Sequence, residues 1–131
     1  MRTSALARAH GVFNILGGGW PLVSMRSFEW VFGPKADRWL ERTVGGLLVT
    51  AGWAQLRATD PVHARRIGVG TAATFLAIDL FYVPAGRLRW TYLLDAAMEA
   101  AWIAAWLRAD ARDGQQRSRG RRPLVAGIRS R

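Results

Sequence analysis

The feature that most constrains this chain is a run of 20 residues, from Ile67 to Gly86, with one charged side chain, Asp79. A helix of about 20 residues crosses the roughly 30 Å hydrocarbon core of a bilayer. A helix on the surface of a globular protein would carry a polar stripe, yet Gly68 to Ile78 holds only small, apolar and threonine residues. This run therefore predicts a membrane-spanning helix.

Three further apolar segments, at about 9–25, 39–56 and 90–107, alternate with short polar hinges. With 67–86 they predict an all-α fold, a four-helix transmembrane bundle that occupies residues 1–107. The chain has seven tryptophans among 131 residues, which supports this interpretation because tryptophan gathers at the boundary between water and lipid. A mean hydropathy of +0.02 is low for such a protein, but the basic C-terminus lowers that mean.

Basic residues set the expected orientation. Residues 108–131 carry eight arginines and two aspartates, out of a net charge of +10 for the chain. Their composition predicts a mobile basic tail that contacts anionic lipid headgroups, and nothing in it is suited to reading nucleic-acid bases. The termini and the 57–66 hinge hold most of the arginines, so the positive-inside rule places both termini in the cytoplasm of a bacterium. The bilayer is thus the first expected partner.

Several chemistries are excluded by composition. The chain has no cysteine and two histidines, so we expect no disulfide, no thiol nucleophile, no metal site and no cofactor. Of the histidines, His10 is expected to be solvated and His63 lies in a polar hinge. Gly17-Gly18-Gly19 lacks the lysine and the serine or threonine of a phosphate-binding loop.

Buried acids are the main candidates for function. Asp95 and Glu99 lie four residues apart and share one helical face. Asp79 is expected at the same depth in the neighbouring helix, and Glu41 and Arg42 lie just inside the start of the second segment. We therefore predict a polar cluster of Glu41, Arg42, Asp79 and Asp95, with Glu99 deeper. Such a cluster is either an ion-pair network that fixes the bundle or a site for a proton, ligand or substrate.

Helix contacts are predicted from small and polar residues. Asn14 is expected to form a hydrogen bond between helices, and the Gly46, Thr50, Ala54 spacing predicts close packing. The hinge from Ser27 to Trp39 interleaves aromatic and charged side chains, with Asp37 placed to cap the second long helix. It is read as an interfacial segment lying on the membrane; the alternative is a lid over the polar cluster.

Three stretches resemble small four-helix bacterial membrane proteins of unknown function. They are Phe-Asn-Ile-Leu-Gly-Gly at 13–18, Gly-Pro-Lys-Ala-Asp-Arg-Trp-Leu at 33–40 and Tyr-Leu-Leu-Asp at 92–95. The resemblance covers about residues 8–107, and the layout is also similar to DoxX-like and EXPERA-like bundles. In the EXPERA-like group, acids inside the bundle bind or isomerise sterol-like ligands, but no residue role transfers to this chain.

Three functions remain open, and whether the protein is an enzyme is left undecided. The first is a non-catalytic accessory or assembly subunit of a membrane complex, with a membrane protein as partner; it would have a filled core and arginine-paired acids. The second is a bundle that binds or converts a small lipophilic ligand, which a pocket beside the acids would favour. The third is a proton-coupled carrier acting as a homo-oligomer, which acids facing each other across a two-fold interface would favour.

Overall fold

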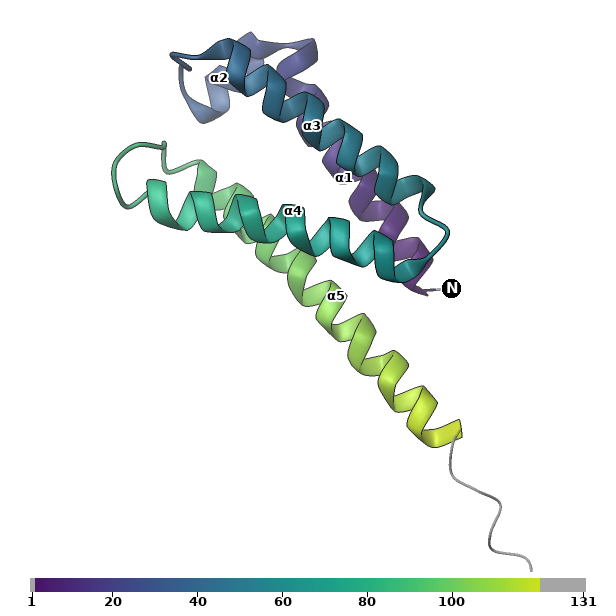
Figure 1. Cartoon of the computed structure of the whole chain (residues 1–131). Helices are drawn as coiled ribbons and strands as arrows, with labels where there is room; N and C mark the ends of the chain where they lie inside the picture. The colour runs from purple at the N-terminus through teal and green to yellow at the C-terminus, as the bar shows by residue number, and fades with distance from the viewer. Residues whose placement is uncertain (1, 121–131) are drawn as a thin grey trace, which may run out of the picture.

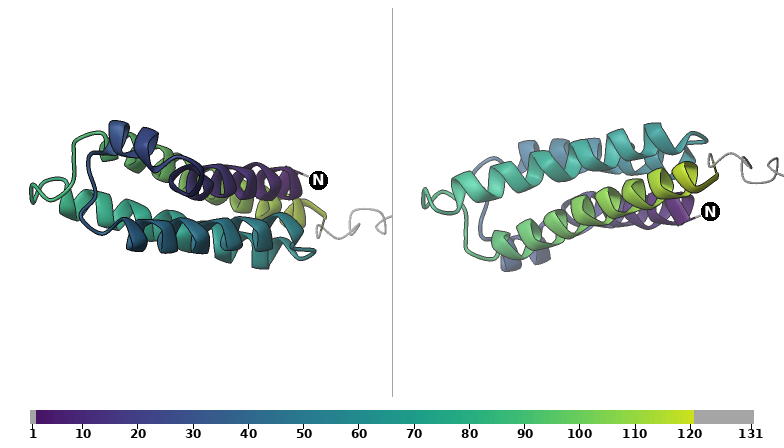
Figure 2. Two further views of the ribbon diagram at one scale, coloured as in Figure 1. Left: turned by 90° about the horizontal axis from the view of Figure 1, so that it is seen from above. Right: turned by 90° about the horizontal axis from the view of Figure 1, so that it is seen from below.

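The computed structural model describes residues 2–120, and within that range every regular element is an α-helix. The five helices are α1 (Arg2–Val23), α2 (Met25–Phe32), α3 (Arg38–Arg57), α4 (Pro61–Tyr82) and α5 (Tyr92–Gly120) (Figure 1). The four long helices run side by side, with α1 packed chiefly on α3 and α4 on α5 (Figure 2). The N-terminus and the last turns of α5 lie at one end of the bundle, and α2 lies at the other.

Local capping explains where the helices begin and end. The Ser24 hydroxyl accepts a hydrogen bond from the Ser27 N–H at 3.3 Å, which caps the start of α2. Asp60 caps α4 in the same way, accepting from the Val62 N–H at 2.8 Å. Gly33 ends α2 with a φ of +88°, a backbone conformation that side-chain-bearing residues avoid. The expected cap of α3, Asp37, stands at the cap position but makes no side-chain capping bond.

Glycines bring α1 and α3 into backbone contact. A Cβ atom at Gly18 would lie 2.5 Å from the carbonyl oxygen of Gly45, and one at Gly52 would lie 2.6 Å from that of Gly11. Gly11 and Gly18 are seven residues apart on α1, and Gly45 and Gly52 are seven residues apart on α3. Both contacts therefore fall on one face of each of the two antiparallel helices. The predicted packing residue Gly46 is not part of this face, because a Cβ there would meet no atom within 4 Å.

The interior of the bundle contains several fully buried polar side chains. Five polar side chains are at most 2% exposed, namely His10, Asn14, Gln55, Asp79 and Glu99. Large apolar side chains lie on the outside instead, among them Val23 at 88% and Trp30 at 82% exposure. This arrangement reverses the usual distribution of polar and apolar residues.

The predicted four-helix transmembrane bundle is wrong. The described chain has five helices, because α2 forms inside the 24–42 hinge, and none of the helices within 2–120 has the length and apolar content needed to cross a membrane. One physical reason is that α4 ends at Tyr82, so the apolar run from Ile67 to Gly86 is not one continuous helix. The assignment to a bacterial cytoplasmic membrane with cytoplasmic termini depended on such spans and falls with them.

The basic C-terminal segment is divided between described and undescribed residues. Helix α5 continues past Leu107 and remains helical to Gly120. The rest of the segment predicted as a tail, 121–131, lies outside the described residues.

Candidate functional site

Three acids from two helices meet inside the bundle. Asp79 comes from α4, at 1% exposure, and Glu99 from α5, at 2% exposure, while Asp95 lies one turn before Glu99 and is partly buried. The spacing of Asp95 and Glu99 places both carboxyls on the face of α5 that packs on α4. The structure therefore brings together three of the five residues predicted to form a polar cluster.

All three carboxyls have raised pKa values. Burial, the charge of Asp95 and a hydrogen bond to the Asp95 carboxyl raise the pKa of Asp79 to about 7. Burial also raises the pKa of Asp95, against the lowering effect of that same hydrogen bond. Burial and the charges of Asp95 and Asp79 raise the pKa of Glu99 to about 7. Asp79 and Glu99 therefore titrate near neutral pH, and Asp79 and Asp95 titrate as a pair.

Of the other two predicted members, Glu41 lies near the trio, whereas Arg42 does not join it. Glu41 is half-buried at the start of α3, where burial raises its pKa and Lys35 opposes that shift. Arg42 is exposed. Among residues 2–120 the ion pairs are Glu29–Arg38, Asp60–His63 and Asp110–Arg65, so no arginine neutralises the buried acids.

A cavity of about 180 Å³ adjoins the acids. The carboxyl-bearing residues in its wall are Glu41, Asp95 and Glu99, and the rest of the lining is mostly apolar. Six aromatic side chains contribute to that lining: Phe13, Trp20, Phe28, Phe32, Phe75 and Tyr92. One carboxylate oxygen of Glu99, Oε2, is buried without a hydrogen-bond partner among the described residues. The site therefore combines an apolar chamber with an unsatisfied acid in its wall.

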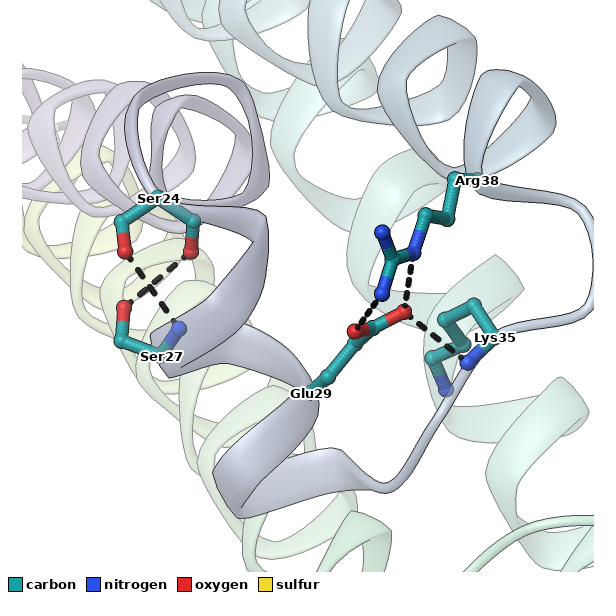
Figure 3. A network of polar contacts seen from close by, with 5 residues as sticks. All are labelled: Ser24, Ser27, Glu29, Lys35 and Arg38. Carbon is teal, nitrogen blue, oxygen red and sulfur yellow. Dashed lines mark hydrogen bonds and ion pairs between the residues drawn. The ribbon is translucent and has the colours of Figure 1, made fainter.

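Helix α2 lines one side of this cavity. Glu29 of α2 accepts two hydrogen bonds from Arg38, at 2.8 and 2.7 Å, and one from the Lys35 N–H at 3.1 Å (Figure 3). These bonds tie α2 to the start of α3. Phe28 and Phe32, one turn apart on α2, both face the cavity.

Contacts from the α4–α5 loop and the start of α5 hold α2 and the segment after it in place. The Thr91 hydroxyl donates to the Val31 carbonyl at 2.8 Å, and the Arg89 guanidinium donates to the Trp30 carbonyl at 3.2 Å. The Lys35 ammonium donates to the Tyr92 hydroxyl and lies 4.4 Å from the centre of that ring. Nothing in the periodicity of the sequence indicates these contacts, because they join segments about 60 residues apart.

A second polar cluster lies toward the other end of the bundle. Asn14 donates from Nδ2 to the Gln55 Oε1 at 3.1 Å, which links α1 to α3. His10 accepts from the Trp106 indole N–H at 3.0 Å and stacks on Trp102 with ring centres 4.4 Å apart. A Cβ at Gly68 would lie 2.5 Å from Gln55 Nε2, so the absence of a side chain on α4 makes room for the cluster.

The burial of His10 contradicts the prediction made from the sequence. It was expected in solvent, yet it is fully buried, and burial lowers its pKa to about 4. The imidazole is therefore neutral at neutral pH, and because Nδ1 accepts the bond from Trp106, the proton resides on Nε2. That Nε2–H has no partner among the described residues.

Metal chemistry has no support in the described part of the chain. No group of three or more histidine, cysteine, aspartate or glutamate side chains within 2–120 has an arrangement that could hold a metal ion. The acid trio is thus a set of proton-holding groups beside a cavity.

The chain matches no protein-family model, no curated protein and no solved structure. The likeness to DoxX-like and EXPERA-like bundles therefore stays an expectation from the sequence, and the geometry above is the basis for function.

Proposed function

We propose that this protein binds a small lipophilic molecule in the cavity between α1, α2, α3 and α5, with Glu99 and Asp95 as the polar contacts. Two observations carry the proposal: Glu99 belongs to the lining of a mostly apolar cavity, and its Oε2 is buried without a hydrogen-bond partner among the described residues. An unsatisfied buried polar atom costs about 1–3 kcal/mol. A ligand that forms a hydrogen bond to this oxygen would recover that energy.

The size of the cavity limits the ligand. A cavity of roughly 150 Å³ lined by aliphatic and aromatic side chains binds benzene in an engineered protein. The volume here, about 180 Å³, accommodates a ring with one short substituent. Such a small ligand makes few contacts, so we expect weak to moderate affinity.

The accessory-subunit interpretation has less support than this proposal. A filled core in which every buried acid is paired with an arginine would favour it. Within the described residues Asp79, Asp95 and Glu99 form no ion pair, and Arg42 is exposed. These three acids therefore lack the ion pairs that would favour the accessory-subunit interpretation.

Gly17 offers a direct test of binding. It lines the cavity between Phe13 and Trp20 on one face of α1, and a Cβ there would meet no atom within 4 Å. The Cβ of a leucine at this position points the same way as those two aromatic side chains and meets no atom, and the rest of the leucine side chain competes for ligand volume. Gly46→Leu is the matched control, because Gly46 also has open space around its Cβ but does not line the cavity.

The experiment is a calorimetric titration of the full chain with toluene, benzyl alcohol and benzylamine. We expect at least one of the three to bind the wild type and Gly46→Leu, and Gly17→Leu to lose that binding while keeping its fold. If none of the three binds the folded wild type, or if Gly17→Leu binds as well as the control, the cavity is not a ligand site.

A further inference from the structure

The cavity carries more negative than positive groups. Three acids, Glu41, Asp95 and Glu99, belong to its wall, and Asp79 lies directly behind them. The basic side chain that acts on one of these acids is Lys35, the only lysine of the chain, which interacts with Glu41 and Glu29. The acid trio is thus left without a counter-charge among the described residues.

The apolar part of the wall is aromatic, and aromatic faces attract cations. Ring quadrupoles stabilise an ammonium group within about 6 Å of the ring centre. Lys35 already uses this interaction at one end of the site, with its Nζ 4.4 Å from the Tyr92 ring centre and 5.8 Å from that of Phe28. The protein's own ammonium group therefore demonstrates that these rings accept one.

We propose that the ligand is a small organic cation, a primary amine on a compact apolar body, whose ammonium group contacts Glu99 and Asp95. Its apolar body then lies among the aromatic side chains of α1 and α2. This inference rests on the proposed function, because it assigns the chemical class of the ligand for the same cavity. A cation satisfies Glu99 Oε2 and relieves the repulsion among the acids, whereas a neutral alcohol relieves only the first.

Binding of a cation displaces a proton. Burial together with Asp79 and Asp95 raises the pKa of Glu99 to about 7, so below that pH the carboxyl is protonated. The ammonium ligand binds the carboxylate, and the carboxyl proton leaves to solvent with no other bond broken. Affinity for the amine therefore falls about tenfold per pH unit below about pH 7, with one proton released per ligand bound.

Other titratable groups around the site set the limits of this behaviour. Asp79 from α4 and Asp95 from α5 act on Glu99 directly. Glu41 from α3 and Tyr92 from α5 line the same cavity, and Lys35 from the segment after α2 acts on Glu41 and donates to Tyr92. Helix α1 contributes no titratable side chain to the cavity wall. Since burial raises the Tyr92 pKa above its usual range, that hydroxyl stays neutral and the acids alone titrate around neutrality.

The test compares benzylamine with benzyl alcohol, which share a ring and size but differ in charge. Both are titrated into the full chain at about pH 8 and about pH 6, in buffers of different ionisation enthalpy. We expect benzylamine to bind the wild type about tenfold or more tightly than the alcohol at the higher pH, and to release a proton at the lower one. Glu99→Gln and Asp95→Asn should each reduce the preference for the amine, with the alcohol still bound. Asp37→Asn, an exposed acid outside the cavity, should leave it unchanged.

Different results would refute the cation proposal and the ligand site itself. If benzyl alcohol binds as tightly as benzylamine, or amine binding does not depend on pH, the cavity is a ligand site but not a cation site. If both charge-removing variants fold and retain the full preference for the amine, the ammonium contact with the acids is refuted. If neither of these ligands nor toluene binds the folded wild type, the proposed function itself is wrong.

Discussion

Replacing Gly45 by alanine places a methyl group 2.5 Å from the carbonyl oxygen of Gly18, in the closest contact between α1 and α3. The obstacle is a backbone atom, so no side chain can rotate away and the two helices must separate. Gly46 is the next residue along α3, and a methyl group there meets no atom within 4 Å. The two substitutions are chemically identical and differ only in the face of α3 that receives the methyl group.

The expected magnitudes are opposite in sign. Overpacking costs about 1–3 kcal/mol, and a contact with backbone places Gly45→Ala near the upper end. Alanine in a helix interior is favoured over glycine by about 1 kcal/mol, which leaves Gly45→Ala destabilised by about 2 kcal/mol. Gly46→Ala gains that propensity alone. For a chain of this length about 4 °C of Tm corresponds to 1 kcal/mol, so Tm falls by about 8 °C in the first variant and rises by about 4 °C in the second.

Thermal and urea unfolding followed by circular dichroism measure both variants beside the wild type. The double variant Gly18→Ala/Gly45→Ala adds a further check, because one separation of the helices relieves both clashes and the combined loss is smaller than the sum. Equal Tm shifts for Gly45→Ala and Gly46→Ala, or a gain of stability in the former, would refute the backbone contact between α1 and α3.

Two further predictions concern buried polar groups. Folding raises the Glu99 pKa from 4.5 to about 7, so this group's stabilising contribution is full below its unfolded pKa and is lost as pH rises through about 7. We therefore expect Glu99→Gln to exceed the wild type in free energy of unfolding at about pH 8, by an amount on the order of 3 kcal/mol, and not at about pH 4; parallel pH profiles would contradict this. Trp106→Phe removes the donor to His10 Nδ1 and should cost about 1–3 kcal/mol in urea unfolding, whereas the exposed Trp90→Phe should change stability by less than about 0.5 kcal/mol. Equal losses in the two tryptophan variants would argue against the buried hydrogen bond.

The acid trio follows from helical periodicity, but the cavity does not. Asp95 and Glu99 share a face because four residues complete about one turn. Asp79 lies about as far from the end of α4 as Asp95 lies from the start of α5. The cavity depends on where α2 docks, and contacts such as that between Thr91 and Val31 join distant segments. Local sequence patterns carry no information about such contacts.

The membrane prediction failed at a helix end. The apolar run beginning at Ile67 was read as one helix, yet α4 stops at Tyr82 and the chain turns before α5. Similarly, the glycine contacts could not be assigned from spacing alone. Gly45 and Gly46 are adjacent, and only the rotation of α3 about its axis decides which of them faces α1.

Methionine methyl groups provide the most direct test of the ligand cavity. Met98 lines the cavity, whereas Met25 is buried in α2 outside it. With methyl-labelled methionine, titration of the full chain with benzylamine at about pH 8 should shift the Met98 signal in a saturable way and leave that of Met25 in place. The shift should disappear in Gly17→Leu and persist in Gly46→Leu. An unchanged Met98 signal in the folded wild type, or the same shift at both methionines, would contradict binding in this cavity.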